Sequence, residues 1–72
     1  MKANICGLKI REFRKEQNMG QVDLAEAIKL EHDILLTQSD ISEIERGIRG
    51  VKDFELNAFA LVFNVNVGDL LS

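Results

Sequence analysis

The chain contains one cysteine, Cys6, and one histidine, His32, the residue types that most often carry nucleophilic chemistry or bind transition metals. A single cysteine forms no internal disulfide bond and no cysteine-based metal site. The chain also has no glycine-rich phosphate loop and no nucleophile elbow. We therefore predict no catalytic residue, no metal and no cofactor, so the protein is not expected to be an enzyme. Cys6 is interpreted as a small buried apolar residue of the first helix, and His32 as a solvated loop histidine.

The polar segment 37–47 has the pattern of a short helix. Thr37 and Asp40 fit a capping box, in which each side chain accepts a hydrogen bond from the backbone N–H of the other residue. The apolar stripe and the end of this helix are marked by Ile41, Ile44 and Gly47. The pattern predicts a helix over residues 38–46 whose opposite face is free to make hydrogen bonds. That face carries Gln38, Ser39, Ser42, Glu43 and Arg46.

Four further helices are predicted from apolar residues that recur at helical spacing. They span about residues 5–17, 21–31, 53–64 and 67–71. The strongest pattern is in the fourth helix, whose apolar stripe should form the centre of the core: Leu56, Phe59, Ala60 and Phe63. The patch at residues 34–36 is expected to pack the preceding turn against the core, and a contact with another subunit or a partner is the alternative. Since the chain has no proline and no candidate strand, we predict a single all-α domain over residues 1–72.

The formal net charge is −3, which is uncommon for a protein with a nucleic-acid partner. The charge is unevenly distributed, however. Residues 1–20 contain five basic and two acidic side chains, and a second basic region includes Arg46, Arg49 and Lys52. No apolar run reaches the roughly 18–20 residues that a membrane span needs, and the first residues lack the apolar centre of a secretory signal. We therefore expect a cytoplasmic protein with no membrane partner.

Four motifs occur in order along the chain. They are Ile10-Arg11-x-x-Arg14, Gln21-x-x-Leu24-Ala25, Gln38-Ser39-x-Ile41-Ser42-x-Ile44-Glu45-Arg46-Gly47 and Phe59-Ala60-x-x-Phe63-Asn64-Val65-x-Val67-x-x-Leu70-Leu71. Together they resemble the Cro/C1-type (XRE-like) helix-turn-helix transcriptional regulators, from about Gly7 to Leu71. The resemblance implies a five-helix, lambda-repressor-like DNA-binding domain.

The chain departs from this family in the connection between helices 2 and 3. The connection is about six residues longer than usual and lacks the usual glycine. Some family members with a longer connection begin the fourth helix with the pattern V-x-D-x-E-L, which is present here from Val51 to Leu56. The resemblance therefore implies a lengthened connection rather than a different fold.

The resemblance also implies a role for individual side chains. Arg14 and Glu45 match an arginine–glutamate ion pair that joins the first and third helices and has a structural role. Three side chains match positions that contact DNA bases: Gln38, Ser39 and Glu43. Four others match positions that contact DNA phosphates: Gln21, Arg46, Arg49 and Lys52.

A plainer interpretation stays open for most of these side chains. Glu43 could accept a hydrogen bond from cytosine N4, but it could equally be solvated or pair with Arg46 three residues later. Ordinary solvated surface is the alternative for four others: Gln38, Ser39, Arg49 and Lys52. The acidic Asp40 is interpreted as a helix cap whose charge interacts with backbone N–H groups.

The leading hypothesis is sequence-specific binding of double-stranded DNA by a repressor-like regulator of transcription. The protein would act as a homodimer, with one recognition helix in each of two successive major grooves. Dimerisation is predicted through the fourth helix and the tail at residues 65–71. The alternative is a protein-interaction module or an antitoxin-like component on the same fold, with weak or no DNA binding, which the net charge favours. No small-molecule ligand is evident.

Overall fold

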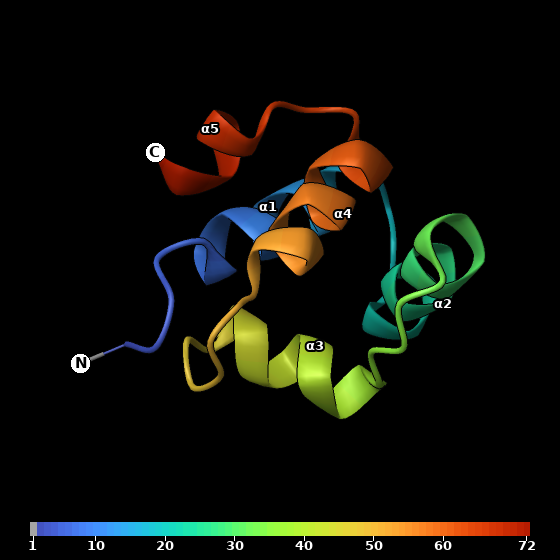
Figure 1. Cartoon of the computed structure of the whole chain (residues 1–72), viewed down its shortest axis with the longest axis horizontal. Coiled ribbons are helices and arrows are strands. Elements are labelled where there is room, and N and C mark those ends of the chain that lie inside the picture. Colours follow the sequence, from blue (N-terminus) through green and yellow to red (C-terminus); the bar gives the residue numbers. More distant parts are fainter. Residues whose placement is uncertain (1) are drawn as a thin grey trace.

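Five helices account for most of residues 2–72, the part of the chain that the computed structural model describes. They are α1 (Gly7–Glu16), α2 (Gln21–His32), α3 (Gln38–Glu45), α4 (Asp53–Phe63) and α5 (Val67–Leu71). In Figure 1, α4 crosses α1 in the centre, α5 lies above them, and α3 runs along the bottom with α2 at the right. No strand occurs within residues 2–72, and the prediction of an all-α fold with five helices is confirmed.

The core lies where the five helices meet. Its largest fully buried side chains come from all five: Ile10, Leu24, Ile28, Ile41, Ile44, Phe59 and Leu70. Phe59 and Phe63 stack on successive turns of α4 with ring centroids 6.4 Å apart, and Phe13 of α1 tilts against Phe63 at 5.9 Å. The apolar stripe predicted for the fourth helix therefore lies in the core, although Leu56 is only partly buried.

The start of α1 differs from the prediction, because Asn4 forms a turn before the helix. Its Oδ1 accepts hydrogen bonds from the backbone N–H groups of Cys6 (3.1 Å) and Gly7 (2.8 Å). The helix therefore begins at Gly7 rather than near residue 5. Cys6 is buried, as predicted, but it precedes the helix instead of lying within it. Burial raises the pKa of the Cys6 thiol, which keeps the thiol protonated.

The connection between α2 and α3 differs in two respects from what the sequence predicted. α2 continues to His32, so this residue is a half-buried helix residue rather than a solvated loop histidine. Asp33 ends the helix in the left-handed conformation (φ 54°) that glycine usually adopts. In the patch that follows, Leu36 is buried but Leu35 is 76% exposed, because adjacent residues of an extended segment point to opposite sides. The patch therefore packs against the core only in part.

Candidate nucleic-acid interface

The polar groups best placed for binding lie on α3, whose first turn is fixed by a reciprocal pair of hydrogen bonds. The Thr37 Oγ1 accepts from the Asp40 N–H at 3.1 Å, and the Asp40 Oδ2 accepts from the Thr37 N–H at 2.9 Å. The predicted capping box is therefore present, and it satisfies a backbone N–H that the helix itself leaves unpaired. Within residues 2–72, no helix is long and apolar enough to cross a bilayer, and no cluster of three or more metal-binding side chains occurs.

A buried ion pair fastens α3 to α1. Arg14 donates from Nε to the Glu45 Oε2 at 2.6 Å and from Nη2 to the Glu45 Oε1 at 3.0 Å. The Arg14 Nη1 donates to the carbonyl of Met19 at 2.8 Å, and the Gln21 Nε2 donates to the Glu45 Oε1 at 3.2 Å. The hydrogen bond to Glu45 raises the pKa of Arg14. A bidentate pair with both side chains at least nine-tenths buried therefore sets the position of α3 relative to α1 and to the start of α2.

The same C-terminal end of α3 is also fastened to the segment that precedes α1. The Asn4 Nδ2 donates to the backbone carbonyls of Ile44 (3.0 Å) and Arg49 (2.7 Å). The Ala3 N–H donates to the carbonyl of Gly47 at 2.8 Å, where the backbone has a φ of 76° that favours glycine. These bonds satisfy carbonyls in and just after the last turn of α3. They join residues at least 40 positions apart, and no sequence pattern predicted them.

The exposed face of α3 and the start of α2 enclose a hollow of about 260 Å³. Its lining includes five of the seven predicted DNA contacts together with Ser42: Gln21, Gln38, Ser39, Ser42, Glu43 and Arg46. These residues supply amide, hydroxyl, carboxylate and guanidinium groups, so the hollow offers both hydrogen-bond donors and acceptors. The Arg46 Nε lies 3.4 Å from the Ser42 carbonyl. The structure thus gathers on one face the kinds of group that hydrogen-bond to base edges and phosphates.

Arg49, which was predicted to contact phosphate, lies outside this hollow and is held by two carboxylates. Its Nη1 and Nη2 donate to the two oxygens of Glu55 at 3.0 and 2.9 Å, and its Nε lies 3.8 Å from the Asp40 Oδ1. Glu55 also accepts from the Lys52 N–H at 2.9 Å. A phosphate would have to displace two carboxylates from Arg49. We therefore do not include Arg49 among the proposed DNA contacts.

The ion pairs around Arg49 make the free energy of unfolding depend on pH. The hydrogen bond from Arg49 holds the pKa of Glu55 below its usual value, and backbone and side-chain hydrogen bonds with Thr37 do the same for Asp40. A carboxyl group with a lowered folded-state pKa stabilises the fold above its unfolded-state pKa, and this contribution is lost as the pH falls. We expect the free energy of unfolding to decrease below about pH 4.5, the ordinary pKa of a glutamic acid.

Urea unfolding at pH 6 and at pH 3 tests this prediction. Glu55→Gln should be less stable than the parent chain at pH 6, because Arg49 loses its carboxylate partner. At pH 3 the difference should shrink, because this pH lies below the ordinary glutamic acid pKa of 4.5 and the unfolded parent chain is then stabilised by taking up a proton at Glu55. Glu31→Gln, at an exposed position of α2, is the control and should match the parent at both pH values. An equal loss of stability in Glu55→Gln at pH 6 and pH 3 would contradict the assignment.

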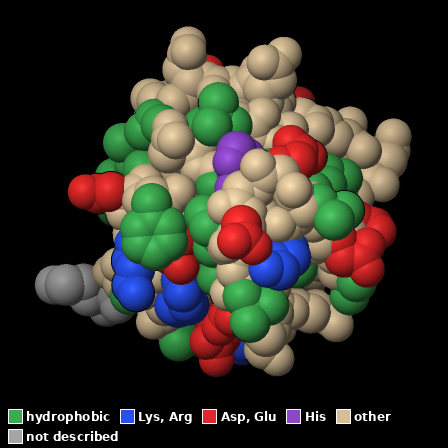
Figure 2. Space-filling model, turned by 45° about the vertical axis from the view of Figure 1, so that its right-hand side comes forward, with side chains coloured by type: hydrophobic (Ala, Val, Ile, Leu, Met, Phe, Trp, Pro, Cys, Tyr) green, Lys and Arg blue, Asp and Glu red, His purple; other side chains and the backbone are tan. Residues whose placement is uncertain are grey.

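Basic side chains do not form a continuous surface on the face that Figure 2 shows. Figure 2 shows a face on which basic, acidic and hydrophobic side chains alternate. Lys52 is exposed and also lies outside the hollow; its Nζ is 5.8 Å from the centre of the Phe54 ring. Since the net charge of the chain is −3, only a local group of basic side chains can attract an anion.

A family model described as helix-turn-helix matches residues 10–70. The chain belongs to the helix-turn-helix family. α2 and α3 are the two helices of this motif, and the second helix of the motif is the one that family members place in the major groove. The expected Cro/C1-type, lambda-repressor-like architecture is confirmed by the family match and by the structural comparisons that follow.

Two solved structures show the extent of the similarity to other helix-turn-helix proteins. The crystal structure of the clp gene regulator ClgR from Corynebacterium glutamicum aligns with a TM-score of 0.79 and 27% sequence identity. The match covers 93% of this chain and 65% of the ClgR chain. This chain therefore spans less than two thirds of the length of ClgR in that structure. The DNA-binding domain of BldD aligns with a TM-score of 0.73 and 24% identity over 99% of this chain and 94% of that chain. A comparison with curated proteins finds no match.

Proposed function

We propose that the protein is a transcriptional regulator that binds double-stranded DNA in a sequence-specific manner, with the exposed face of α3 in the major groove. The observation that supports this most is the grouping of Gln38, Ser39, Glu43 and Arg46 around one hollow on a helix that is capped in its first turn and fastened to the rest of the fold in its last turn. Base recognition requires a recognition helix that is rigidly held, because hydrogen bonds discriminate between bases only when their donors and acceptors are fixed in position. Membership of the helix-turn-helix family and similarity to a gene regulator support the same proposal.

The proposed contacts divide into base readers and phosphate ligands. Gln38 and Ser39 lie at the start of α3 and Glu43 lies one turn further along the same helix; all three are proposed to read base edges. Gln38 is suited to adenine and Glu43 to the amino group of cytosine. The proposed phosphate ligands are Gln21, Arg46 and Lys52. Because the Gln21 side-chain amide already donates to Glu45, the contribution of Gln21 is assigned to its backbone N–H in the first turn of α2.

A repressor-like homodimer is the form in which we propose that the protein acts. Two recognition helices would then contact half-sites roughly 34 Å apart on one side of the duplex. Two apolar side chains on the predicted dimer surface are exposed in the single chain: Leu61 of α4 is 57% exposed and Leu71 of α5 is 43% exposed. Burial of these side chains against a second copy would stabilise the pair through the hydrophobic effect. The repressor role and the dimer are proposals taken from the family resemblance.

Selection of binding sites from a pool of random duplexes tests the proposed function. At low salt the protein should enrich one motif made of two similar half-sites. A matched variant that carries Gln38→Ala, Ser39→Ala and Arg46→Ala should keep its helical circular dichroism and lose the enrichment, because these side chains lie on the exposed face of α3. Failure of the parent chain to enrich any motif would overturn the proposal.

A single substitution separates base reading from phosphate binding. Gln38→Ala should reduce discrimination at one base pair of the motif by about 1–3 kcal/mol while binding to other sequences stays nearly unchanged. Arg46→Ala should instead weaken binding to all duplexes by a similar factor, because phosphates carry no sequence information. Fluorescence anisotropy with the selected duplex and its single-base variants measures both effects. Identical profiles for the two variants would show that the assigned roles are wrong.

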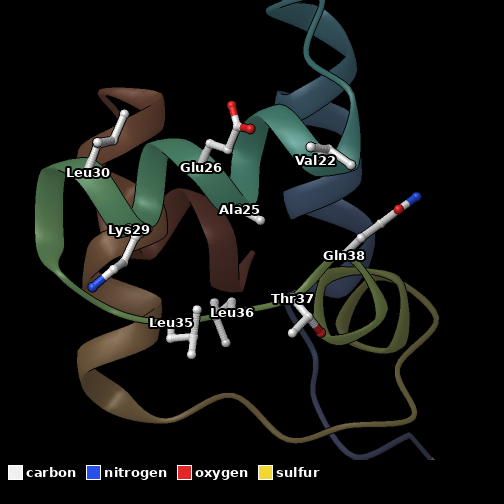
Figure 3. Close-up of a pocket in the computed structure, with 9 residues that line it drawn as sticks. All are labelled: Val22, Ala25, Glu26, Lys29, Leu30, Leu35, Leu36, Thr37 and Gln38. Carbon is white, nitrogen blue, oxygen red and sulfur yellow. The ribbon is translucent and has the colours of Figure 1, made fainter.

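A protein-interaction module is the second candidate function, and an apolar hollow of about 450 Å³ favours it. Figure 3 shows this hollow between α2 and the connection that carries Leu35 and Leu36. Leu30 and Leu35 are 85% and 76% exposed and line this same hollow, so they form an apolar patch that a partner could cover. Under this alternative, selection would enrich no motif, and Leu30→Gln with Leu35→Gln would abolish binding to a protein partner. Under the proposed DNA function, the same double variant should retain the DNA motif.

A further inference from the structure

A second hollow, of about 470 Å³, adjoins the one on the exposed face of α3. The two hollows share Gln21, Ser42 and Arg46, so they form one continuous surface. The second hollow extends from this shared region toward α1 and the segment before it, where it is lined by Lys2 and Arg11. Neither of these residues was a predicted DNA contact.

Positive charge that is not paired within the molecule is concentrated in this second hollow. Four of the nine basic side chains form ion pairs within residues 2–72: Lys9, Arg14, Lys29 and Arg49. Of the five others, three line the hollow: Lys2, Arg11 and Arg46. The acidic side chain in its lining is Glu45, whose charge is already matched by Arg14. The hollow is therefore locally basic in a chain whose net charge is −3.

Lys2 is positioned by the packing of its aliphatic stem and by the hydrogen bonds of the two residues that follow it. A Cβ atom built on Gly47 would lie 3.0–3.3 Å from the Cβ, Cγ and Cδ of Lys2, so the stem lies directly against the glycine. The next two residues are hydrogen-bonded to the end of α3, Ala3 to the carbonyl of Gly47 and Asn4 to the carbonyl of Ile44. A lysine whose stem packs on apolar surface while its ammonium stays in solvent has less freedom to lose on binding a ligand.

We propose that Lys2, Arg11 and Arg46 form a binding site for phosphodiester groups of the DNA backbone. These phosphates would lie next to the base pairs that α3 contacts. The inference rests on the proposed function and adds two residues and a second contact region to it. Three cations from separate segments match the spread of negative charge along a DNA strand, whereas a single cation would contact one phosphate. The site supplies affinity without sequence preference, because its groups contact the backbone.

Salt dependence of duplex binding tests this site directly. The logarithm of the binding constant falls with the logarithm of salt concentration with a slope of about −0.9 for each phosphate neutralised. Lys2→Met and Arg11→Met should each make that slope shallower by about 0.9 and weaken binding about eightfold at 0.1 M salt. The loss should be equal for the selected motif and for a scrambled duplex. Arg11→Lys keeps the charge and should keep the slope.

Lys15→Met is the matched control, because it removes the same charge from an exposed position of α1 that does not line the hollow. It should leave the slope unchanged, and all variants should melt within a few degrees of the parent, since the replaced side chains are exposed. Slopes unchanged in Lys2→Met and Arg11→Met, in a chain that still enriches a motif, would overturn this site alone. If Lys15→Met changed the slope as much as Lys2→Met and Arg11→Met, the total charge of the protein rather than this site would account for the salt dependence. No duplex binding by the parent chain would overturn the site together with the proposed function.

Discussion

Arg14→Met is expected to lower the free energy of unfolding by about 3–5 kcal/mol, because it leaves the carboxylate of Glu45 buried without its charged partner. The Glu45 side chain is 3% exposed, and two of its three hydrogen-bond donors belong to Arg14. A domain of 72 residues has only a small margin of stability, so the variant should be largely unfolded at 37 °C. Urea unfolding followed by circular dichroism at 15 °C measures the loss.

Two further variants separate the buried ion pair from ordinary surface charge. Lys9→Met removes an ion pair with Glu12 whose side chains are 40% and 61% exposed, and it should cost less than about 1 kcal/mol. The double variant Arg14→Met with Glu45→Leu replaces the buried pair by apolar groups and should recover much of the stability, since no unpaired buried charge remains. A loss in Arg14→Met no larger than in Lys9→Met would show that the pair does not hold α3 in place.

Gly7→Ala is expected to destabilise the fold by up to about 3 kcal/mol, because α1 and α3 are in contact through their backbones at this residue. A Cβ atom on Gly7 would lie 2.2 Å from the carbonyl oxygen of Ile44 and 3.2 Å from that of Glu45. Backbone atoms of a helix cannot move aside as a flexible side chain does, so α3 would have to shift as a unit. Thermal unfolding should show the loss, and affinity for the selected DNA motif should fall with it.

Gly68→Ala is the matched control for this prediction. Gly68 lies in α5, and apart from its chain neighbours and the backbone of its own helix no atom lies within 4 Å of the position that its Cβ would occupy. Alanine has a higher helix propensity than glycine, so this variant should be unchanged or more stable by up to about 1 kcal/mol. If Gly7→Ala is as stable as Gly68→Ala, the close approach of α1 and α3 is not present in solution.

The parts of the fold that sequence reasoning predicted well depend on residues close together in the chain. The hydrogen bonds between Thr37 and Asp40 span three positions, and the three-residue spacing of Ile41 and Ile44 corresponds to about one turn of helix. Such patterns follow from helix geometry alone. The exposure of Leu35 was missed for a related reason: a run of apolar residues shows that a segment meets the core but not which of its members face it.

The features that were missed depend on contacts that form only in the folded chain. Asn4 contacts the end of α3 across 40 positions, and nothing in its neighbourhood distinguishes it from a surface asparagine. The predicted phosphate role of Arg49 took no account of Glu55, because the turn that brings the two together forms only in the folded chain. A signal for Lys2 and Arg11 was present in the basic balance of residues 1–20, but only the fold places these side chains beside α3.

Titration of the isotope-labelled protein with its selected duplex, followed by NMR, tests most directly the claim that the exposed face of α3 reads DNA. The largest chemical-shift changes should occur at backbone and side-chain NH groups of residues 38–46, with smaller changes at Lys2, Arg11 and Gln21. A scrambled duplex should preserve the changes at Lys2 and Arg11 and reduce those at Gln38 and Ser39. Changes centred on the apolar hollow beside Leu30 and Leu35, or none on α3, would contradict the account.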